Sequence, residues 1–358
     1  MRSWSGNSRR EFVQGLLALP TLLTANSAAA RDPAREMSLE ARMFSRRLVT
    51  ELPHTPSPVQ ATIGRSVYPQ SFAVNSDDKE IYVLHNFTTD EQKAAIFCAY
   101  DMRTAKLKTW FFSKTRWRET LVYKSIAERR WLYTIGEDAP IRYDITQLPA
   151  PGSVIAPERE YNSQITPYSQ MTSVDDGFAY MVQDKQFSDW RTAKHRWVVV
   201  DNEFNPIRRL DFSPQVTGSY GRTLLSLPKT QGVAWHRGMF VFGCGGAYRP
   251  EARGSSSDAS LPAKQQGLIA ATGSGQLLSS ALCAPDVALQ LTGKMIGREI
   301  GVHECEGVSS GRDGNLYAIW QVQKPSQWKT EGKNWGIVIT EEMYGGDNAF
   351  DYSKGALR

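Results

Sequence analysis

The sequence predicts an all-β fold, a five-bladed β-propeller, from three observations. A pattern of polar residue, apolar run, turn and second apolar run recurs five times. Most of the turns carry Asp-Gly or a close substitute, which between two apolar runs is the strongest short-range signal of a β-hairpin. The repeats begin at intervals close to the ~40–50 residues, with four strands each, that are typical of propeller blades.

The five repeats begin at Gln70, Glu119, Gln170, Gln231 and Glu306, at intervals of 49, 51, 61 and 75 residues. Insertions such as residues 254–266, which are rich in Ser and Ala, account for the longer intervals. Each repeat start leads into a hairpin. Further strands are predicted at 95–100, 108–112, 197–201, 208–212, 267–270 and 335–339. A pair of β-sandwiches is the structural alternative, but it gives no reason for a fivefold polar start.

The first thirty residues read as a twin-arginine signal peptide. Arg9 and Arg10 precede the apolar run 12–23, and the small residues 28–30 predict cleavage before Arg31. An ordinary secretory signal is the alternative. The apolar run is much shorter than the ~20 residues of a membrane-spanning helix. We therefore expect a protein that is secreted or held in the cell envelope, with no membrane span after cleavage.

Residues 31–59 are predicted to form an N-terminal arm or a short helix, and residues 60–358 the propeller. Apolar residues recur within 32–48, but Pro53, Pro56 and Pro58 are expected to break any regular structure that follows. Helical signals elsewhere are few. The chain length suits one large β domain, and a monomer is expected.

The charge argues against nucleic acid as a partner. The formal net charge is +5, of which the signal peptide residues Arg2, Arg9, Arg10 and Glu11 contribute a net +2, leaving +3 for the rest. This excess is small, and no run of five or more basic residues occurs. Mild positive charge is compatible with an anionic polymer, although many proteins with neutral ligands share it.

The first candidate site is the ring of repeat starts Gln70, Glu119, Gln170, Gln231 and Glu306. The first strand of each blade lines the central channel, so these side chains are expected to converge near the axis. Buried polar groups need partners. Two interpretations remain open: the amides bond across blades and hold the ring closed, or they bind a ligand.

The second candidate is the run His303-Glu304-Cys305-Glu306. Alternate side chains share one face of a strand, so Glu304 and Glu306 are expected to point the same way, about 6.6–7 Å apart. Such a carboxylate pair can divide acid and base roles, and Glu119 could complete a catalytic set across the channel. A metal site using His303, one of these glutamates and His236 is a weaker alternative, because the spacing matches no common zinc pattern.

Other chemistry finds little support in the sequence. No nucleophile elbow, P-loop or dinucleotide fingerprint occurs, and no cofactor or metal is predicted. His85 and His236 flank blade strands near the predicted channel mouth, and Trp235 and Trp320 are candidate platforms for sugar rings. The four cysteines, Cys98, Cys244, Cys283 and Cys305, leave disulfides and buried thiols equally open.

The start at Gln70-Ser71-Phe72 resembles the opening blade of propellers described as teichoic acid biosynthesis protein C. These are related to receptor-binding propellers of phages of Gram-positive bacteria. Gln231-Gly232-Val233 and Glu306-Gly307-Val308 are similar to later blade starts of that family, and the resemblance spans roughly residues 60–343. It implies a five-bladed propeller with a cell-surface glycopolymer as ligand. The Glu119 start and the acidic Glu304/Glu306 pair depart from the family pattern.

Three functions follow from these observations. The first is a secreted module that binds a polysaccharide or an anionic, teichoic-acid-like wall glycopolymer. The second is a glycan-cleaving enzyme, a glycoside hydrolase or a polysaccharide lyase, with Glu119, Glu304 and Glu306 as its acids. The third is a propeller that binds a protein partner and no glycan. The environment of the glutamates separates the first two: a cleft near a third acid favours the enzyme, whereas pairing of Glu304 and Glu306 with arginines favours the binding module.

Overall fold

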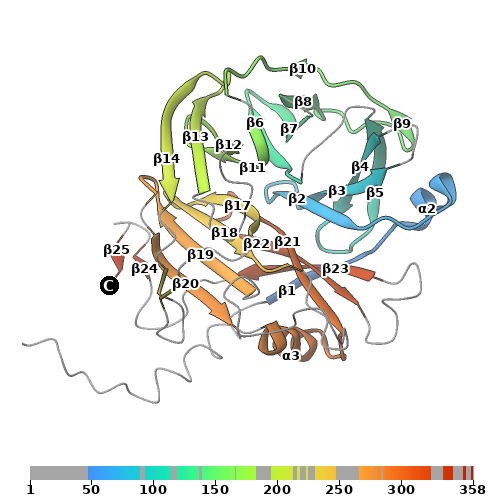
Figure 1. Ribbon diagram of the computed structural model, residues 1–358. Helices are drawn as coiled ribbons and strands as arrows, with labels where there is room; N and C mark the ends of the chain where they lie inside the picture. The colour runs from blue at the N-terminus through green and yellow to red at the C-terminus, as the bar shows by residue number, and fades with distance from the viewer. Residues whose placement is uncertain are drawn as a thin grey trace, which may run out of the picture. The chain divides into compact units, whose positions relative to one another are not determined.

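The computed structural model describes residues 47–88, 93–113, 119–136, 139–165, 167–182, 195–212, 216–217, 223–224, 230–246, 266–275, 277–283, 285–323, 334–341, 350–351 and 356–357. All of them belong to one compact unit, Ala41–Arg358. The predicted signal peptide and residues 31–46 of the predicted arm lie outside the described residues. The described chain is mostly strand (Figure 1).

Five sheets of four or five strands, here called blades 1 to 5, form most of the described part of the unit, and their main strands are antiparallel. Blade 1 holds β2 (Pro69–Asn75), β3 (Glu80–Thr88), β4 (Lys93–Asp101) and β5 (Leu107–Ser113), with β9 (Ser153–Val154) parallel to β5. Blade 2 holds β6 (Val122–Ile126), β7 (Arg129–Ile135), β8 (Pro140–Asp144) and β10 (Arg159–Glu160). Blade 3 holds β11 (Pro167–Val174), β12 (Gly177–Val182), β13 (His195–Asp201) and β14 (Pro206–Phe212). Blade 4 holds β17 (Thr230–His236), β18 (Met239–Cys244), β19 (Gln266–Thr272) and β20 (Leu277–Cys283).

Blade 5 combines the two ends of the unit. It holds β21 (Val302–Ser310), β22 (Leu316–Gln323), β23 (Asn334–Glu341) and, as its outermost strand, β1 (Arg47–Pro53). β1 pairs antiparallel with β23, from Arg47 opposite Thr340 to Pro53 opposite Trp335. Part of the segment predicted as an arm or short helix is therefore a strand. Its pairing links the start of the described chain to the last blade.

The blades form a closed ring of five, as the sequence predicts. Their first strands contact one another in the order β2, β6, β11, β17 and β21, and β21 contacts β2 again. Five clusters of buried apolar side chains fill the five spaces between neighbouring blades. The cluster between blades 5 and 1, for example, joins Ile319 to Phe72 and Ile81. The closed arrangement is that of a five-bladed β-propeller.

The core clusters explain the many aromatic residues of the sequence. Trp197, Tyr133, Tyr180, Phe178 and Phe204 are among the largest fully buried side chains. Burial of one large apolar side chain contributes roughly 1.5–3 kcal/mol. Four of these five, together with Tyr161, form a group of closely spaced rings between blades 2 and 3. Most of the aromatic side chains that the structure describes therefore belong to the core.

Hydroxyl side chains join the first strands of neighbouring blades. Thr120 Oγ1 accepts a hydrogen bond from the Met171 N–H at 3.0 Å, which links blade 2 to blade 3. Thr172 Oγ1 accepts from the Trp235 N–H at 3.0 Å, and Ser309 Oγ from the Val74 N–H at 3.1 Å. These bonds satisfy main-chain donors that have no strand partner at the inner edge of a blade.

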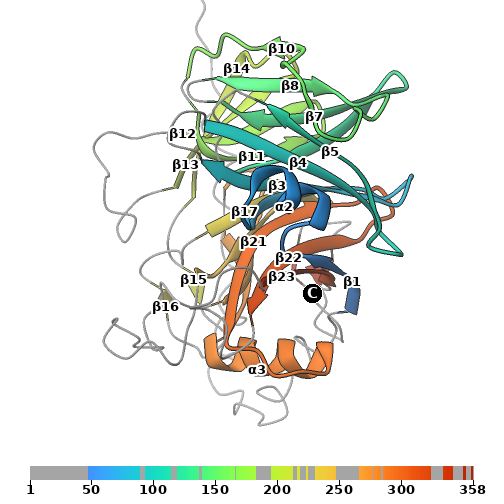
Figure 2. The ribbon, with the colours of Figure 1, turned by 90° about the vertical axis from the view of Figure 1, so that its right-hand side faces the viewer.

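Two helices lie outside the sheets. α2 (Ser57–Ile63) follows β1 directly, with a proline in its first turn. The prediction that Pro58 breaks regular structure is wrong here, because proline is tolerated in the first turn of a helix, where its missing N–H has no partner to lose. α3 (Pro285–Ile296) contacts β21, β1 and β19, and Figure 2 shows it beside the end of β21. The short pairs β15 (Val216–Thr217) with β16 (Thr223–Leu224) and β24 (Phe350–Asp351) with β25 (Ala356–Leu357) complete the elements.

Candidate functional site at the polar rim

The polar residues that begin the repeats lie at irregularities of the first strands. The register between first and second strands shifts by one residue at Gln70, Gln231 and Glu306. Gln170 lies within a longer irregularity between Pro167 and Met171. A bulge leaves its extra residue unpaired in the ladder and re-aims its side chain, so bulges often occur at sites. The feature recurs at equivalent places in four blades.

Hydrogen bonds bring several of these side chains together. Gln170 Nε2 donates to the main-chain oxygen of Thr230 at 2.7 Å, across blades 3 and 4. Gln231 Nε2 donates to Glu304 Oε1 at 2.9 Å, across blades 4 and 5. Gln170, Thr230 and Gln231 are buried, and Glu304 is half-buried. We call Gln70, Gln170, Gln231, Glu304 and Glu306 the polar rim.

Part of the rim's hydrogen-bonding capacity is unused. Gln170 Oε1 is buried without a hydrogen-bond partner in the described part of the structure. Gln70 Nε2 makes only a long bond of 3.4 Å to the adjacent Pro69 oxygen. Cross-blade bonding by the amides thus agrees with the first interpretation of the ring, but the unused acceptor of Gln170 leaves a place for water or ligand atoms.

Glycines explain why the rim motifs of blades 4 and 5 read Gln-Gly and Glu-Gly. A Cβ added at Gly232 would lie 2.6 Å from Gly307 Cα, which is closer than real side chains allow. The backbones of β17 and β21 therefore approach directly behind Gln231 and Glu306. This close approach fixes the two polar side chains on neighbouring strands.

Glu119 does not join the rim as the repeat pattern predicts. It is exposed and precedes β6, which begins only at Val122. The neighbouring Thr120 is buried and makes the bond to blade 3 instead. The pattern misplaced the start of the repeat because the polar residue here belongs to the connection, where nothing forces it inward. Glu119 is thus exposed, whereas Glu306 is buried and Glu304 is half-buried.

The run 303–306 divides between core and rim. His303 is fully buried; its Nε2 lies 2.9 Å from Thr292 Oγ1, its Nδ1 bonds to Gln266 Oε1, and its ring stacks on Trp320 at 4.2 Å. It therefore anchors α3 to blades 4 and 5. Because the bulge falls at Glu306, Glu304 and Glu306 are not related by simple strand alternation.

His85 lies at the rim beside Gln70. It is 1% exposed, is register partner to Pro69, and neither of its ring nitrogens has a hydrogen-bond partner within the described residues. His54, just after β1, has one buried ring nitrogen, Nε2, in the same condition. Burial lowers the pKa of His85 to about 3, with a further contribution from His54, and burial lowers the pKa of His54 to about 4. Both imidazoles are neutral near pH 7.

The other predicted ligand residues lie elsewhere. His236 ends β17, five residues beyond Gln231 along the strand, and its Nδ1 lies 2.9 Å from Ser310 Oγ. Burial, followed by the nearby Arg237, lowers the pKa of His236 to about 4. Trp235 is half-buried and donates from Nε1 to Asp175 at 2.9 Å. Trp320 is fully buried in the cluster between blades 4 and 5.

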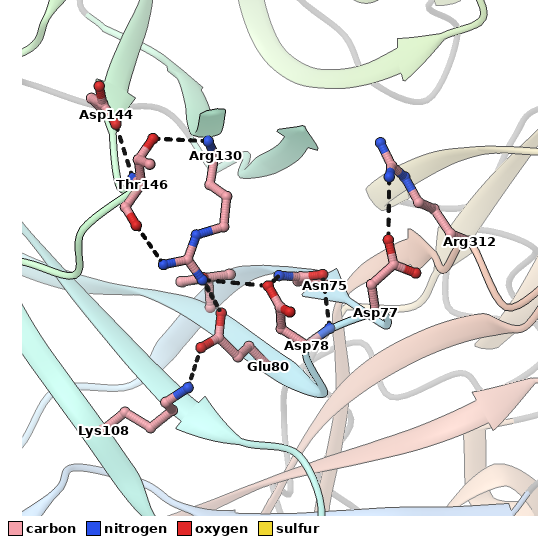
Figure 3. A network of polar contacts seen from close by, with 10 residues as sticks. Asn75, Asp77, Asp78, Glu80, Lys108, Arg130, Asp144, Thr146 and Arg312 are labelled. Carbon is pink, nitrogen blue, oxygen red and sulfur yellow. Dashed lines mark hydrogen bonds and ion pairs between the residues drawn. The ribbon is translucent and has the colours of Figure 1, made fainter. Parts of the chain in front are cut away.

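The opposite end of the first strands carries paired charges, shown in Figure 3. The carboxylate of Glu80 is 2% exposed and contacts Lys108, the hydroxyl of Tyr82, and Arg130 Nη1 at 3.2 Å. Arg130 lies in blade 2 and also donates to the Thr146 main-chain oxygen at 2.7 Å, so its contact with Glu80 joins blade 1 to blade 2. We call Glu80, Asp78, Lys108 and Arg130 the charged network. Nearby, Arg312 of blade 5 contacts Asp77 at 3.2 Å.

Several further predictions meet the described structure only in part. Cys98, Cys244 and Cys305 are buried thiols, whereas the side chain of Cys283 lies outside the described part. Within the described ranges, no group of three or more His, Cys, Asp or Glu side chains is arranged to hold a metal ion. Neither described helix is long and apolar enough to cross a membrane.

Sequence reasoning missed His54 and Tyr68. Both fall in or beside a proline-rich segment that carries no repeat signal. Their rings stack with centroids 6.3 Å apart. Only the return of the chain from blade 5 to blade 1 brings them to the rim, so the sequence offered no usable signal beyond the residue types themselves.

The chain matches no family model and no curated protein. Among solved structures, it is similar to the catalytic domain of Coprinopsis cinerea GH62 alpha-L-arabinofuranosidase, with a TM-score of 0.47, 11% identity, and 83% of this chain and 98% of that chain covered. It is also similar to Kuenenia stuttgartiensis hydrazine synthase, with a TM-score of 0.35 and 13% identity over 76% of this chain. The chain spans 63% of the length of that hydrazine synthase chain.

Proposed function

We propose that this protein is a secreted propeller that binds a cell-surface or wall glycopolymer at its polar rim. The main observation in its support is that a buried amide or carboxylate recurs at a strand irregularity in four blades. Amides can both donate hydrogen bonds to sugar hydroxyls and accept them, and carboxylates accept them. Export rests on the twin-arginine pattern of residues 1–30.

Unsatisfied polar atoms support a ligand-binding role. A buried polar atom without a partner costs about 1–3 kcal/mol. The unpaired atoms of Gln170 and His85 therefore weaken the fold unless water or a ligand completes their hydrogen bonds. The rim combines these atoms with groups held in place by bonds between blades, which is a preorganised arrangement.

Cleavage of the polymer is the second candidate function. It draws on the two glutamates of β21 within the rim. Two features favour binding over cleavage: Glu304 accepts a hydrogen bond from Gln231, and Glu119 lies exposed outside the rim. A glycosidase of the usual kind needs two carboxyl groups flanking one bond.

Binding to a defined set of polymers tests the proposal. Purified full-length protein is incubated with immobilised glucan, galactan, arabinan and poly(glycerol phosphate), and both retention and released reducing ends are measured. Gln170→Ala is expected to weaken retention about tenfold, while Gln164→Ala, at an exposed glutamine before blade 3, is expected to leave it unchanged.

The outcomes separate the candidates. Retention without products, lost in Gln170→Ala, supports binding at the rim. Reducing ends released by the wild type and abolished in Glu306→Gln favour the enzyme. Retention that is equal in Gln170→Ala and Gln164→Ala contradicts a site at the rim. No retention on any of the four polymers overturns the proposed function.

A further inference from the structure

Tyr68 stands out among the aromatic side chains. It is 40% exposed and is the only exposed aromatic residue among those whose side chains the structure describes. The other described aromatic side chains are buried or half-buried. Tyr68 immediately precedes β2 and lies two residues before Gln70, so its backbone leads directly into the polar rim.

The ring of Tyr68 is held from behind. The ring of His54 stacks on it with an interplanar angle of 24°. The segment between them is tied at its ends, because Thr55 Oγ1 accepts from the Val67 N–H at 2.8 Å and donates to the Val67 oxygen at 2.7 Å. The exposed face of Tyr68 is thus a positioned aromatic surface rather than the end of a loose loop.

Hydrogen-bonding atoms without partners lie next to this surface. His54 Nε2 and both ring nitrogens of His85 are buried and have no partner among the described residues. The pairing of Pro69 with His85 places the second imidazole at the same strand end. Buried imidazole nitrogens in this condition call for water or ligand hydroxyls as partners.

The charge state of the two imidazoles near Tyr68 indicates the kind of ligand. Burial lowers the pKa of both imidazoles far below neutrality, and the only charged-group effect on either is that of His54 on His85. Neither imidazole carries a positive charge near pH 7, so neither can pair with a phosphate placed here. An uncharged sugar presents an apolar face to an aromatic ring and hydroxyls to polar atoms at its edge.

We propose that Tyr68 is the stacking platform of a subsite for an uncharged sugar residue, with the buried ring nitrogens of His54 and His85 reaching its hydroxyls through ordered water. This inference rests on the proposed function and narrows its ligand from glycopolymers in general to those with neutral sugar units. It replaces Trp235 and Trp320 as the aromatic part of the site.

Variants of Tyr68 test the subsite. Affinity for immobilised glucan, galactan, arabinan and poly(glycerol phosphate) is measured for the full-length wild type, Tyr68→Ala and Tyr68→Phe. Tyr68→Ala is expected to weaken binding to the preferred neutral polymer about tenfold or more, and Tyr68→Phe to stay within about twofold, because the ring face carries the contact. Ile207→Ala is the matched control, because Ile207 is an exposed apolar residue in blade 3; no effect on binding is expected.

The measurements distinguish failure of the proposed subsite from failure of the proposed function. If the wild type binds a polymer and Tyr68→Ala binds it equally well, the subsite is wrong while the proposed function stands. Preference of the wild type for poly(glycerol phosphate) over all three neutral polymers also overturns the subsite. If the wild type binds none of the four, the proposed function itself fails. Thermal unfolding of each variant shows whether a loss of binding comes from loss of the fold.

Discussion

The charged network and the polar rim lie at opposite ends of the first strands. They differ in whether their buried polar groups have hydrogen-bond partners. In the charged network, the buried carboxylate of Glu80 has Lys108, Arg130 and Tyr82 around it (Figure 3). At the rim, Gln170 and His85 keep buried atoms without partners. Satisfied polar groups fix one structure, whereas unsatisfied ones weaken it unless something binds.

Loss of the buried carboxylate should have the largest effect on stability. Glu80→Ala leaves Arg130 and Lys108 without their shared partner and removes a contact between blades 1 and 2. We expect the free energy of unfolding to fall by about 3–5 kcal/mol, measured by urea denaturation. Asp77→Asn, in the exposed pair with Arg312, is the control with little expected change. Equal effects of the two variants would refute the distinction between buried and exposed pairs.

Acid should act through the histidine of the rim. The pKa of His85 is about 3 in the folded protein, below its ordinary 6.5, so the unfolded chain binds the proton first as pH falls. The contribution of His85 to the free energy of unfolding is fully present above pH 6.5 and is lost as pH falls towards 3. At pH 4 the loss is about 3 kcal/mol. His85→Leu should reduce, but not abolish, the fall of the urea midpoint between pH 7 and pH 4, because the pKa values of His54 and His236 are also lowered to about 4; an unchanged slope would contradict the prediction.

The smallest stability change is expected at the rim amide. Gln170→Leu removes the two hydrogen bonds from Nε2 to the main-chain oxygen and Oγ1 of Thr230, but it also removes the unpaired Oε1. The two effects oppose each other, so the free energy of unfolding, measured by thermal denaturation, should change by less than about 1 kcal/mol. Under the proposed function, the same variant loses affinity for its polymer. A large destabilisation without loss of binding would assign Gln170 to the fold and not to the ligand.

The sequence was most informative where local chemistry and the fold agree. Asp-Gly turns and alternating apolar runs predicted the hairpins of blades 3, 4 and 5 closely, as at Gly177 and Gly314. The polar starts marked Gln70, Gln170, Gln231 and Glu306, all of which are buried at strand irregularities. The pattern failed at Glu119, because one sequence cannot show whether a polar residue lies in a strand or in the connection before it.

The sequence by itself determined the five repeats and the residue types that face the centre, because strand periodicity and turn preference are local properties of the chain. Only the tertiary structure decided that β1 completes blade 5, since that pairing joins residues nearly 300 positions apart. It also decided which polar atoms are satisfied. His303 is bonded on both ring nitrogens, whereas His85 is bonded on neither. That difference depends on which side chains of other blades arrive beside each ring, and no spacing along the chain encodes it.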